Sequence, residues 1–273
     1  MSLKFYNEVY KSGHPSGYDG GVDGMPDRVK KLWSKTETWL IDSGLKVNTT
    51  AKILEVGSGM SYLSKIHPGW HGAEYSKSAV QRVKERDGQD TQIFEEDAQY
   101  LSFQTNYFDG IFTWATLEHV PNPDKAFREI HRVLKKGGGA LIAPAWNCRS
   151  WTVKKIEQQP LSELSFKEKI ERFFIPIREH IIYRALFAIP IRLSYELYFF
   201  FVKSELSLRY KSLQPNWELI EKYGHVSDDD ALADIDIHSA ILFFLSRGYI
   251  IRSHPNFLSR LFSRHEPLIV QKP

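Results

Sequence analysis

The 273-residue chain contains a single cysteine, Cys148. One cysteine excludes an internal disulfide framework and a multi-cysteine zinc site. The chain also lacks a marked charge excess, because 36 Lys and Arg stand against 33 Asp and Glu. Nucleic-acid binders usually carry a pronounced basic excess or a basic stripe. We therefore expect no nucleic-acid partner.

The first residues contain no apolar run of signal-peptide length, so we expect a cytoplasmic protein. Residues 181–202 are long enough to cross a bilayer. They include Arg184, Arg192 and Glu196, each of which costs about 2.5–3.5 kcal/mol near a bilayer centre, and Pro190 interrupts the run. We expect no transmembrane span, and peripheral contact with a membrane surface stays open.

Strands and helices are predicted to alternate from residue 52 onward. Short apolar runs predict strands at residues 52–56, 71–74, 92–95, 108–114 and 140–143, with helices at 77–86 and 123–134 between them. We expect Gly137 to Gly139 to end the second of these helices. Repeated β-α-β units imply a parallel sheet covered by helices on both faces.

The strand–helix pattern breaks between about residue 147 and residue 235. This stretch has few predicted strands and a helical periodicity. A helix capped by Asp236 and strands at 249–252 and 268–270 then resume the pattern. We therefore divide the chain into an N-terminal helical and loop segment (1–48, with a flexible loop at 12–24), a core (49–148 and 236–273) and a helical insertion (149–235).

A glycine-rich turn, Gly57-Ser58-Gly59, follows the first predicted strand. Such a turn lets a ligand approach the backbone near the N–H groups of a helix end. Glu74 closes the next strand, where a carboxylate accepts hydrogen bonds from both hydroxyls of a ribose. A dinucleotide fingerprint would have a third glycine where Tyr62 stands, and no phosphate-binding G-x-x-x-x-G-K-[ST] loop is present. The turn is suited to a nucleoside without a polyphosphate.

Five ordered segments resemble class I S-adenosylmethionine-dependent methyltransferases, in particular the type 11 methyltransferase domain. The resemblance covers roughly residues 50–145 and 235–273. It departs from the family pattern at Ser61, where a third glycine is usual, and at Lys136, where proline is usual. The matching segments are Glu55–Gly59, Gly72–Ser76, Glu96–Ala98, Tyr107–Ile111 with Leu117–Val120, and Arg132–Gly138.

The resemblance implies an α/β fold of the Rossmann-like, doubly wound kind. It implies a seven-stranded, mostly parallel sheet with an antiparallel C-terminal strand, and places the insertion as a cap between strand five and the last helix. It also implies S-adenosyl-L-methionine as the cofactor, with Glu74 on the ribose and Asp97 on the adenine amino group. The implied cofactor-binding residues are Glu55, Gly57, Ser58, Gly59, Glu74, Tyr75, Asp97, Ala98, Thr113, Trp114 and, from an N-terminal segment folded over the cofactor, Tyr6 and Tyr10.

The acceptor is less well defined by the sequence. His119 follows the fourth strand, which borders the methyl group in this family, so it is the candidate general base, although a structural histidine is the alternative. The Asn/Asp-Pro-Pro-Tyr/Phe motif of nucleobase and glutamine amide methylation is absent after that strand. We predict O-methylation of a small molecule or a glycan, with Trp146 and His225 as candidate substrate contacts.

No metal is expected, because the acids that follow His225 are better interpreted as an acidic loop before a helix. Cys148 is expected to be a bystander. An apolar stripe, Ile182, Leu186, Ile189, Leu193, Leu197 and Phe200, runs along residues 181–202. We favour packing of this stripe on the core or on a partner protomer, so a homo-oligomer stays open.

Three other interpretations remain at this stage. The aromatic residues of the insertion could close the acceptor site as a cap. The insertion could bring a membrane-surface methyltransferase to a lipid-linked acceptor. Finally, the chain could be a regulatory or assembly protein that binds S-adenosylmethionine without transferring its methyl group.

Overall fold

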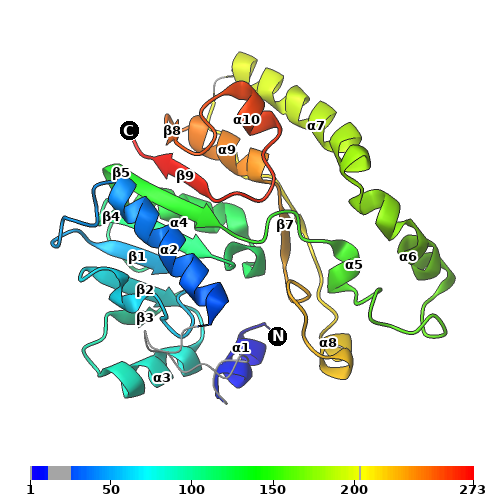
Figure 1. Cartoon of the computed structure of the whole chain (residues 1–273), viewed down its shortest axis with the longest axis horizontal. Coiled ribbons are helices and arrows are strands. Elements are labelled where there is room, and N and C mark those ends of the chain that lie inside the picture. Colours follow the sequence, from blue (N-terminus) through cyan, green and yellow to red (C-terminus); the bar gives the residue numbers. More distant parts are fainter. Residues whose placement is uncertain (1, 12–25, 203) are drawn as a thin grey trace. The chain divides into compact units, whose positions relative to one another are not determined.

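A computed structural model describes residues 2–11, 26–202 and 204–273 of the chain (Figure 1). The loop predicted at residues 12–24 lies outside the described residues. The chain forms two compact units. Unit 1 comprises Met1–Leu117, Lys125–Pro144 and Ile269–Pro273, and unit 2 comprises Glu118–Asp124 and Ala145–Leu268. The three-part division drawn from the sequence stays a prediction.

The main sheet has seven strands in the order β3-β2-β1-β4-β5-β9-β8. Strands β1 to β5 pair in parallel, and the C-terminal strand is antiparallel, as the resemblance implied. The predicted Rossmann-like fold, with its mostly parallel seven-stranded sheet, is therefore confirmed. The strands are β1 (Ile53–Val56), β2 (Trp70–Glu74), β3 (Ile93–Glu95), β4 (Phe108–Trp114), β5 (Leu134–Ala143), β8 (Ile250–Ile251) and β9 (Leu268–Gln271).

The first strand shows why this sheet forms. All four residues of β1 are buried, which is typical of a parallel strand covered on both faces. Helix α2 (Asp27–Asp42) lies across the sheet (Figure 1) and buries Trp39 and Leu40 against it. Helix α3 (Lys77–Asp87) packs on β2 and β3 and adds Val80 and Val83 to the same core. Further elements of this part are α1 (Ser2–Lys11) and η1 (Ser64–Ile66). The chain crosses between the two units within η2 (Leu117–His119) and at the start of α4 (Pro123–Val133).

The junction between α4 and β5 differs from the prediction. The helix ends at Val133 and the strand begins at once at Leu134, so Gly137 to Gly139 belong to β5 instead of ending a helix. Pairing with β4 explains the difference, because Gly139 lies opposite Gly110 in the register. A Cβ atom on Gly138 would lie 2.8 Å from the carbonyl oxygen of Asp109, so glycine permits this close backbone approach.

Unit 2 is mainly helical and has small apolar cores of its own. One core contains Trp151, Ile156, Leu164 and Ile175, and another contains Cys148, Val153 and Ala231. Its two-stranded sheet pairs β6 antiparallel with β7. The predicted Asp236 cap is present, since its side chain accepts from the backbone N–H of His238. The elements are α5 (Ser150–Val153), α6 (Phe166–Glu179), α7 (Ile181–Val202), β6 (Tyr210–Ser212), α8 (Trp217–Tyr223), β7 (Ala233–Ile235), α9 (Ile237–Leu245) and α10 (Phe257–Leu261).

Helix α7 is continuous through Pro190. Within the described ranges it is the one helix long and apolar enough to cross a membrane, judged by length and composition alone. The apolar stripe is not covered within unit 2, since Leu186 and Leu197 are 67% and 53% exposed, and its packing on the core or on a partner protomer stays a prediction. The buried residues of α7 are instead Arg192 and Glu196, because polar partners elsewhere in unit 2 draw those two side chains inward.

Candidate functional site

The loop after β1 is shaped by its glycines. Gly57 and Gly59 have φ angles of +74° and +50°, in the left-handed region that glycine adopts freely. A Cβ atom on Gly57 would lie 2.2 Å from the side chain of Thr116, so space as well as conformation requires glycine there. Ser61, at the family's third glycine, is also left-handed, with a φ of +55°. The serine therefore adopts at this position the left-handed conformation that glycine adopts freely.

Glu74 ties this loop to the end of β2. Its Oε2 accepts a hydrogen bond from the backbone N–H of Gly59 at 2.7 Å, and its Oε1 accepts from Ser76 at 2.8 Å. Burial raises the pKa of Glu74 above its usual range, while these backbone donors oppose the rise. Each carboxylate oxygen keeps a second lone pair for a further donor. Glu74 is therefore fixed in position and can still accept hydrogen bonds.

Three buried hydroxyl groups surround the same edge of the sheet. The Oγ atoms of Ser58 and Ser61 and the Oγ1 atom of Thr113 have no hydrogen-bond partner among the described residues. Buried polar groups are normally paired, so unpaired hydroxyls indicate partners from a bound molecule. They lie beside β1 and β4, where the strand order reverses direction, and ligands of open α/β sheets bind at this point.

Helix α1 lies against this edge of unit 1. Its Asn7 Oδ1 accepts hydrogen bonds from the Ser76 hydroxyl at 2.9 Å and from the backbone N–H of Ser78 at 3.3 Å. The hydroxyl oxygen of Tyr10 would lie 3.2 Å from a Cβ atom on Gly59. Tyr10 is thus next to the glycine-rich loop, where the resemblance placed it. Tyr6 is half-buried on the same helix, with its ring against that of Phe5.

Glu55 and Asp97 are held by neighbours in unit 1. Glu55 is buried and accepts a hydrogen bond at 2.8 Å from the indole N–H of Trp70. Burial raises the pKa of Glu55 to about 8, so it is mainly protonated at neutral pH. The Asp97 carboxylate accepts from the backbone and side-chain amides of Gln99 at 2.8 and 3.1 Å. A role on the cofactor stays a prediction for both residues.

The other predicted cofactor residues are near the ends of β2, β3 and β4. Trp114 donates its indole N–H to Thr36 Oγ1 at 2.9 Å, which fixes its ring beside α2. Tyr75 is 41% exposed, and Ala98 is half-buried in the turn after β3. The parallel register brings the ends of these strands to one edge, so the residues lie along one side of unit 1.

A second polar group lies in unit 2. Glu118 is fully buried, and its Oε1 accepts from the backbone N–H of Ala145 at 3.0 Å. Its Oε2 has no hydrogen-bond partner within the described part of the chain, and burial raises the pKa of the carboxyl. His119 lies between two acids, with Nε2 3.6 Å from Glu118 Oε1 and Nδ1 3.5 Å from Asp230 Oδ2. Its side chain is 20% exposed, so a solvent-accessible imidazole is flanked by buried carboxyl groups.

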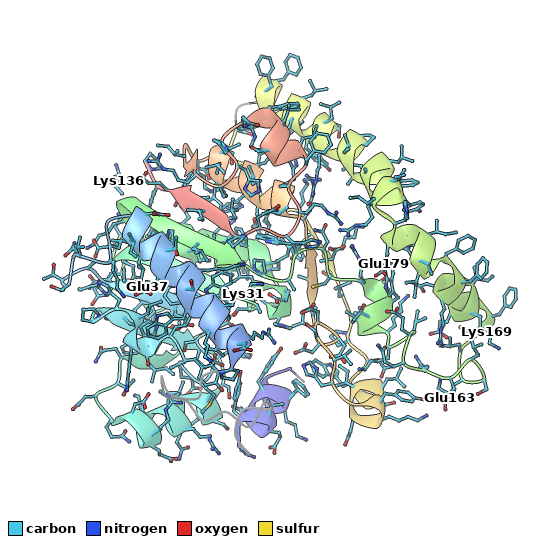
Figure 2. The ribbon with its side chains drawn as sticks, viewed as in Figure 1. Lys31, Glu37, Lys136, Glu163, Lys169 and Glu179 are labelled. Carbon is cyan, nitrogen blue, oxygen red and sulfur yellow. The ribbon has the colours of Figure 1, made fainter. Side chains whose placement is uncertain are left out.

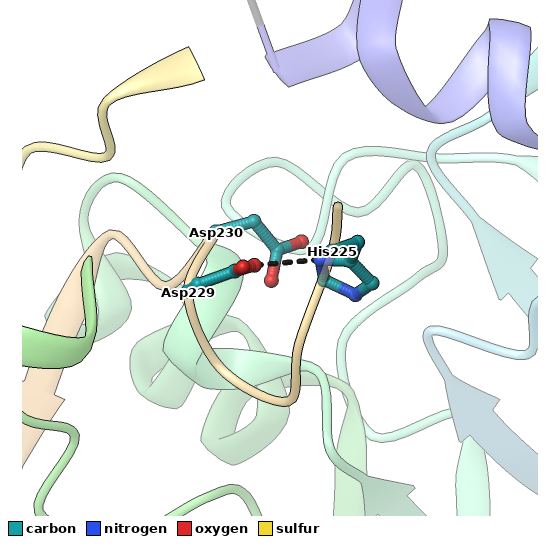
Figure 3. A group of neighbouring side chains, drawn as sticks. All are labelled: His225, Asp229 and Asp230. Atoms are coloured by element: carbon teal, nitrogen blue, oxygen red, sulfur yellow. Dashed lines mark hydrogen bonds and ion pairs between the residues drawn. The ribbon is translucent and has the colours of Figure 1, made fainter. Parts of the chain in front are cut away.

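His225 belongs to a neighbouring network (Figure 3). Its Nδ1 lies 2.6 Å from Asp229 Oδ1, and this hydrogen bond raises the pKa of the imidazole. Ligand atoms of His225, Asp229 and Asp230 lie within 4.8 Å of one another, the spacing of a metal site. However, Asp229 also forms a buried ion pair with Lys155, whose ammonium donates to the Gly224 carbonyl. That cation already neutralises the carboxylate that a metal would need, so the donor set does not favour one.

Two other predicted residues are buried in unit 2. The candidate substrate contact Trp146 donates its indole N–H to the Glu266 carbonyl at 3.1 Å. Cys148 is buried, and desolvation raises the pKa of its thiol, which disfavours the nucleophilic thiolate. Sequence reasoning missed the roles of Glu118, Asp230 and Lys155. Of these three residues, only Asp230 belongs to a feature that stands out in the sequence, the acidic run at 228–230, which we interpret from the sequence as an acidic loop before a helix.

Comparison with known proteins shows which family the region of the main sheet is similar to. Residues 54–142 match the methyltransferase domain family. The match begins in β1 and ends in β5, so it includes the glycine-rich loop and Glu74. This part of the chain, about a third of its length, is therefore similar to a methyltransferase domain.

Individual relatives match over short stretches. A chloroplastic 2-methyl-6-phytyl-1,4-hydroquinone methyltransferase of Spinacia oleracea is 44% identical over 55 residues, covering 20% of this chain and 16% of that protein. Phosphoethanolamine N-methyltransferase 2 of Caenorhabditis elegans is 32% identical over 76 residues, covering 26% of this chain and 17% of that protein. Methyltransferase GfsG of Streptomyces halstedii is 31% identical over 109 residues, covering 36% of this chain and 39% of that protein. The chain thus spans well under half of the length of each of these relatives.

Proposed function

We propose that this chain is an S-adenosyl-L-methionine-dependent methyltransferase. The observation that carries the proposal is Glu74, fixed at the end of β2 by the N–H groups of Gly59 and Ser76 and able to accept further donors. The buried, unpaired hydroxyls of Ser58, Ser61 and Thr113 beside it fit a polar ligand at this edge. The match of residues 54–142 to the methyltransferase domain family supports the same function.

The residues present fit S-adenosylmethionine, whose sulfonium supplies an electrophilic methyl group. Glu74 would accept hydrogen bonds from the ribose hydroxyls. Asp97 would accept from the adenine amino group, as the resemblance implies. The loop at Gly57 to Gly59 lets the ligand approach the backbone, and Tyr10 covers that loop. These assignments place the cofactor entirely on residues of unit 1.

We further propose that the reaction is O-methylation of a small molecule or a glycan. Bound S-adenosylmethionine would supply the methyl group to the acceptor oxygen, and its sulfonium would become a neutral thioether. The hydroxyl proton passes to His119, and Asp230 stabilises the imidazolium that forms.

The relatives leave the acceptor open. Their names specify a phytyl hydroquinone in one case and the nitrogen of phosphoethanolamine in another. The named acceptors therefore differ in chemistry while methyl transfer is common to them. A cytoplasmic location and a homo-oligomer also stay proposals.

Transfer from labelled S-adenosylmethionine to a panel of hydroxyl-bearing acceptors tests this function. We expect His119→Gln to lower kcat by about 10²–10⁴-fold, the usual contribution of a general base, without weakening cofactor binding. Asp230→Asn should lower kcat less, because the imidazolium then loses the nearby carboxylate. The exposed His265 provides the control, since His265→Gln should leave kcat unchanged.

Two outcomes contradict parts of the proposal. An unchanged kcat in His119→Gln would remove His119 as the base. If the cofactor binds and no acceptor in a broad panel is methylated, a binding protein with a regulatory or assembly role becomes the better account.

A further inference from the structure

Helix α7 turns its charged side chains inward and its apolar side chains outward. Arg192 and Glu196 are 6% and 8% exposed, whereas Leu186 and Phe201 are 67% and 77% exposed. A helix on the surface of a soluble protein normally has the opposite orientation. The outward face of α7 therefore requires an apolar environment that unit 2 itself does not provide.

Buried ion pairs within unit 2 fix this orientation. Arg192 pairs with Asp236, the N-cap of α9, and donates to the carbonyls of Leu261 and Ser263 at 2.7 and 2.8 Å. Glu196 accepts from Arg260 at 3.1 Å and lies 3.2 Å from the Nε2 atom of His238. Rotating the helix to bury its apolar side would break both groups of contacts. The outward apolar face is thus part of the folded state.

The exposed apolar surface continues onto the helices that contact α7. Helices α6 and α10 both pack against it, and side chains project outward along α6 and α7, where Lys169 and Glu179 mark α6 (Figure 2). Monomeric soluble proteins rarely expose so large a continuous apolar patch. We call the following exposed residues the outer apolar face: Phe166, Ile170, Phe173, Phe174, Ile177, Ile181, Ile182, Leu186, Phe187, Ile191, Leu193, Leu197, Tyr198, Phe200, Phe201, Val202, Phe257, Leu258 and Phe262.

The charges around this face indicate what covers it. Residues 166–211 and 247–264, which include α6, α7 and α10, contain thirteen Lys and Arg against five Glu. Without the inward-facing or buried side chains of Arg192, Arg247, Arg260 and Glu196, ten Lys and Arg stand against four Glu. Basic residues around an apolar surface attract anionic lipid headgroups. In a two-fold dimer the same face of two copies would meet, so one net-basic surface would lie against another. The local basic excess therefore favours an anionic membrane over a second copy.

Spanning the membrane is incompatible with the same contacts. A transmembrane α7 would have to leave Asp236, His238 and Arg260, and would carry Arg192 and Glu196 into the hydrocarbon without them. A helix that lies in the membrane plane keeps all of these contacts and buries only its outer side. At 22 residues, α7 would cover about 33 Å of the surface.

We propose that the outer apolar face binds the surface of an anionic lipid bilayer, with α7 lying in the plane of the interface. Apolar side chains of such helices reach about 5–10 Å into the boundary between headgroups and acyl chains. This inference concerns unit 2 and holds whether or not the proposed methyl transfer is correct. If both the membrane binding and the methyl transfer are correct, the enzyme meets its methyl acceptor at a lipid surface.

Flotation of the full chain with vesicles tests the proposal. Wild type should float with phosphatidylcholine vesicles that contain phosphatidylglycerol, and less with phosphatidylcholine alone or at high salt. The combined variant Leu186→Gln, Leu197→Gln and Phe201→Gln should reduce the partition coefficient at least tenfold. Its control replaces three exposed apolar residues elsewhere, Ile41→Gln, Val47→Gln and Leu161→Gln, and should bind as wild type does.

Circular dichroism and sedimentation velocity without lipid complete the test. All three proteins should have the same helix content, because the substituted side chains are exposed. Failure of wild type to float, or equal loss of binding in both variants, would overturn the proposal. A lipid-free dimer that only the α7 variant loses would identify a second copy as the occupant and would also overturn it.

Discussion

Gly57 carries two separate constraints at a single position. Its φ of +74° is one that a residue with a Cβ atom adopts at a cost, and Thr116 occupies the space where that atom would lie. Gly44 has nearly the same φ, +72°, with nothing within 4 Å. Substitutions at these two glycines therefore separate the cost of the left-handed backbone conformation from the cost of a steric clash.

We predict that Gly57→Ala destabilises unit 1 more than Gly44→Ala does. The left-handed conformation should cost about 1–2 kcal/mol in each variant. The collision with Thr116 should add about 1–3 kcal/mol at residue 57 alone, the usual range for overpacking. Urea unfolding of both variants measures the difference, and equal losses would show that the loop relaxes around the new methyl group.

Glu55 should make stability depend on pH. Its pKa is raised to about 8 in the fold, against an ordinary value of 4.5 in the unfolded chain. Between these values the folded state holds more protons, so the free energy of unfolding falls as pH rises from about 4.5 to 8 and then levels off. In Glu55→Gln, the free energy of unfolding should fall less steeply with pH than in wild type. The difference in slope should be up to about 1.4 kcal/mol per pH unit.

Melting temperatures measured between pH 5 and 8.5 test this expectation. The exposed Glu95 on β3 provides the control, and Glu95→Gln should keep the wild-type slope. If Glu55→Gln and wild type show the same slope, burial of the carboxyl does not control the pH dependence.

At the scale of single elements, α7 depends on a polar anchor. Glu196 faces His238 and Arg260, and all three lie in unit 2. We predict that Glu196→Ala destabilises the protein by about 3–5 kcal/mol, because it leaves the buried His238 and the guanidinium of Arg260 without their carboxylate. Ser194→Ala, on the exposed side of the same helix, should change the free energy of unfolding by less than about 0.5 kcal/mol. Equal effects in denaturant unfolding would contradict the anchoring role.

The sequence predicts well the elements that depend on residues close together in the chain. The apolar run at 108–114 coincides with β4, and the Asp236 cap was found because its partner is two residues away. The orientation of α7 was not predictable in this way, because Arg192 and Glu196 find their partners 42 to 71 residues further along the chain. The extent of β5 was missed for a similar reason, since pairing with β4 outweighs the local effect of three glycines.

At the scale of the whole molecule, the two candidate sites differ in how far the sequence predicted them. Glu74 and the Gly57 loop were identified because motif spacing places them at adjacent strand ends, and the structure joins them through a hydrogen bond. The group around His119 depends on Asp230, which the fold of unit 2 brings from a distant loop. Motif spacing therefore predicts contacts between adjacent strand ends well and contacts to a distant loop poorly, and the roles of both groups on cofactor and acceptor stay predictions.

Isothermal titration of the full chain with S-adenosyl-L-methionine tests the central claim most directly. We predict micromolar binding by wild type, a loss of about tenfold or more in Glu74→Gln, and wild-type affinity in the control Glu95→Gln. Absence of binding by the folded wild-type protein would contradict the assignment of Glu74 and of the methyltransferase function together.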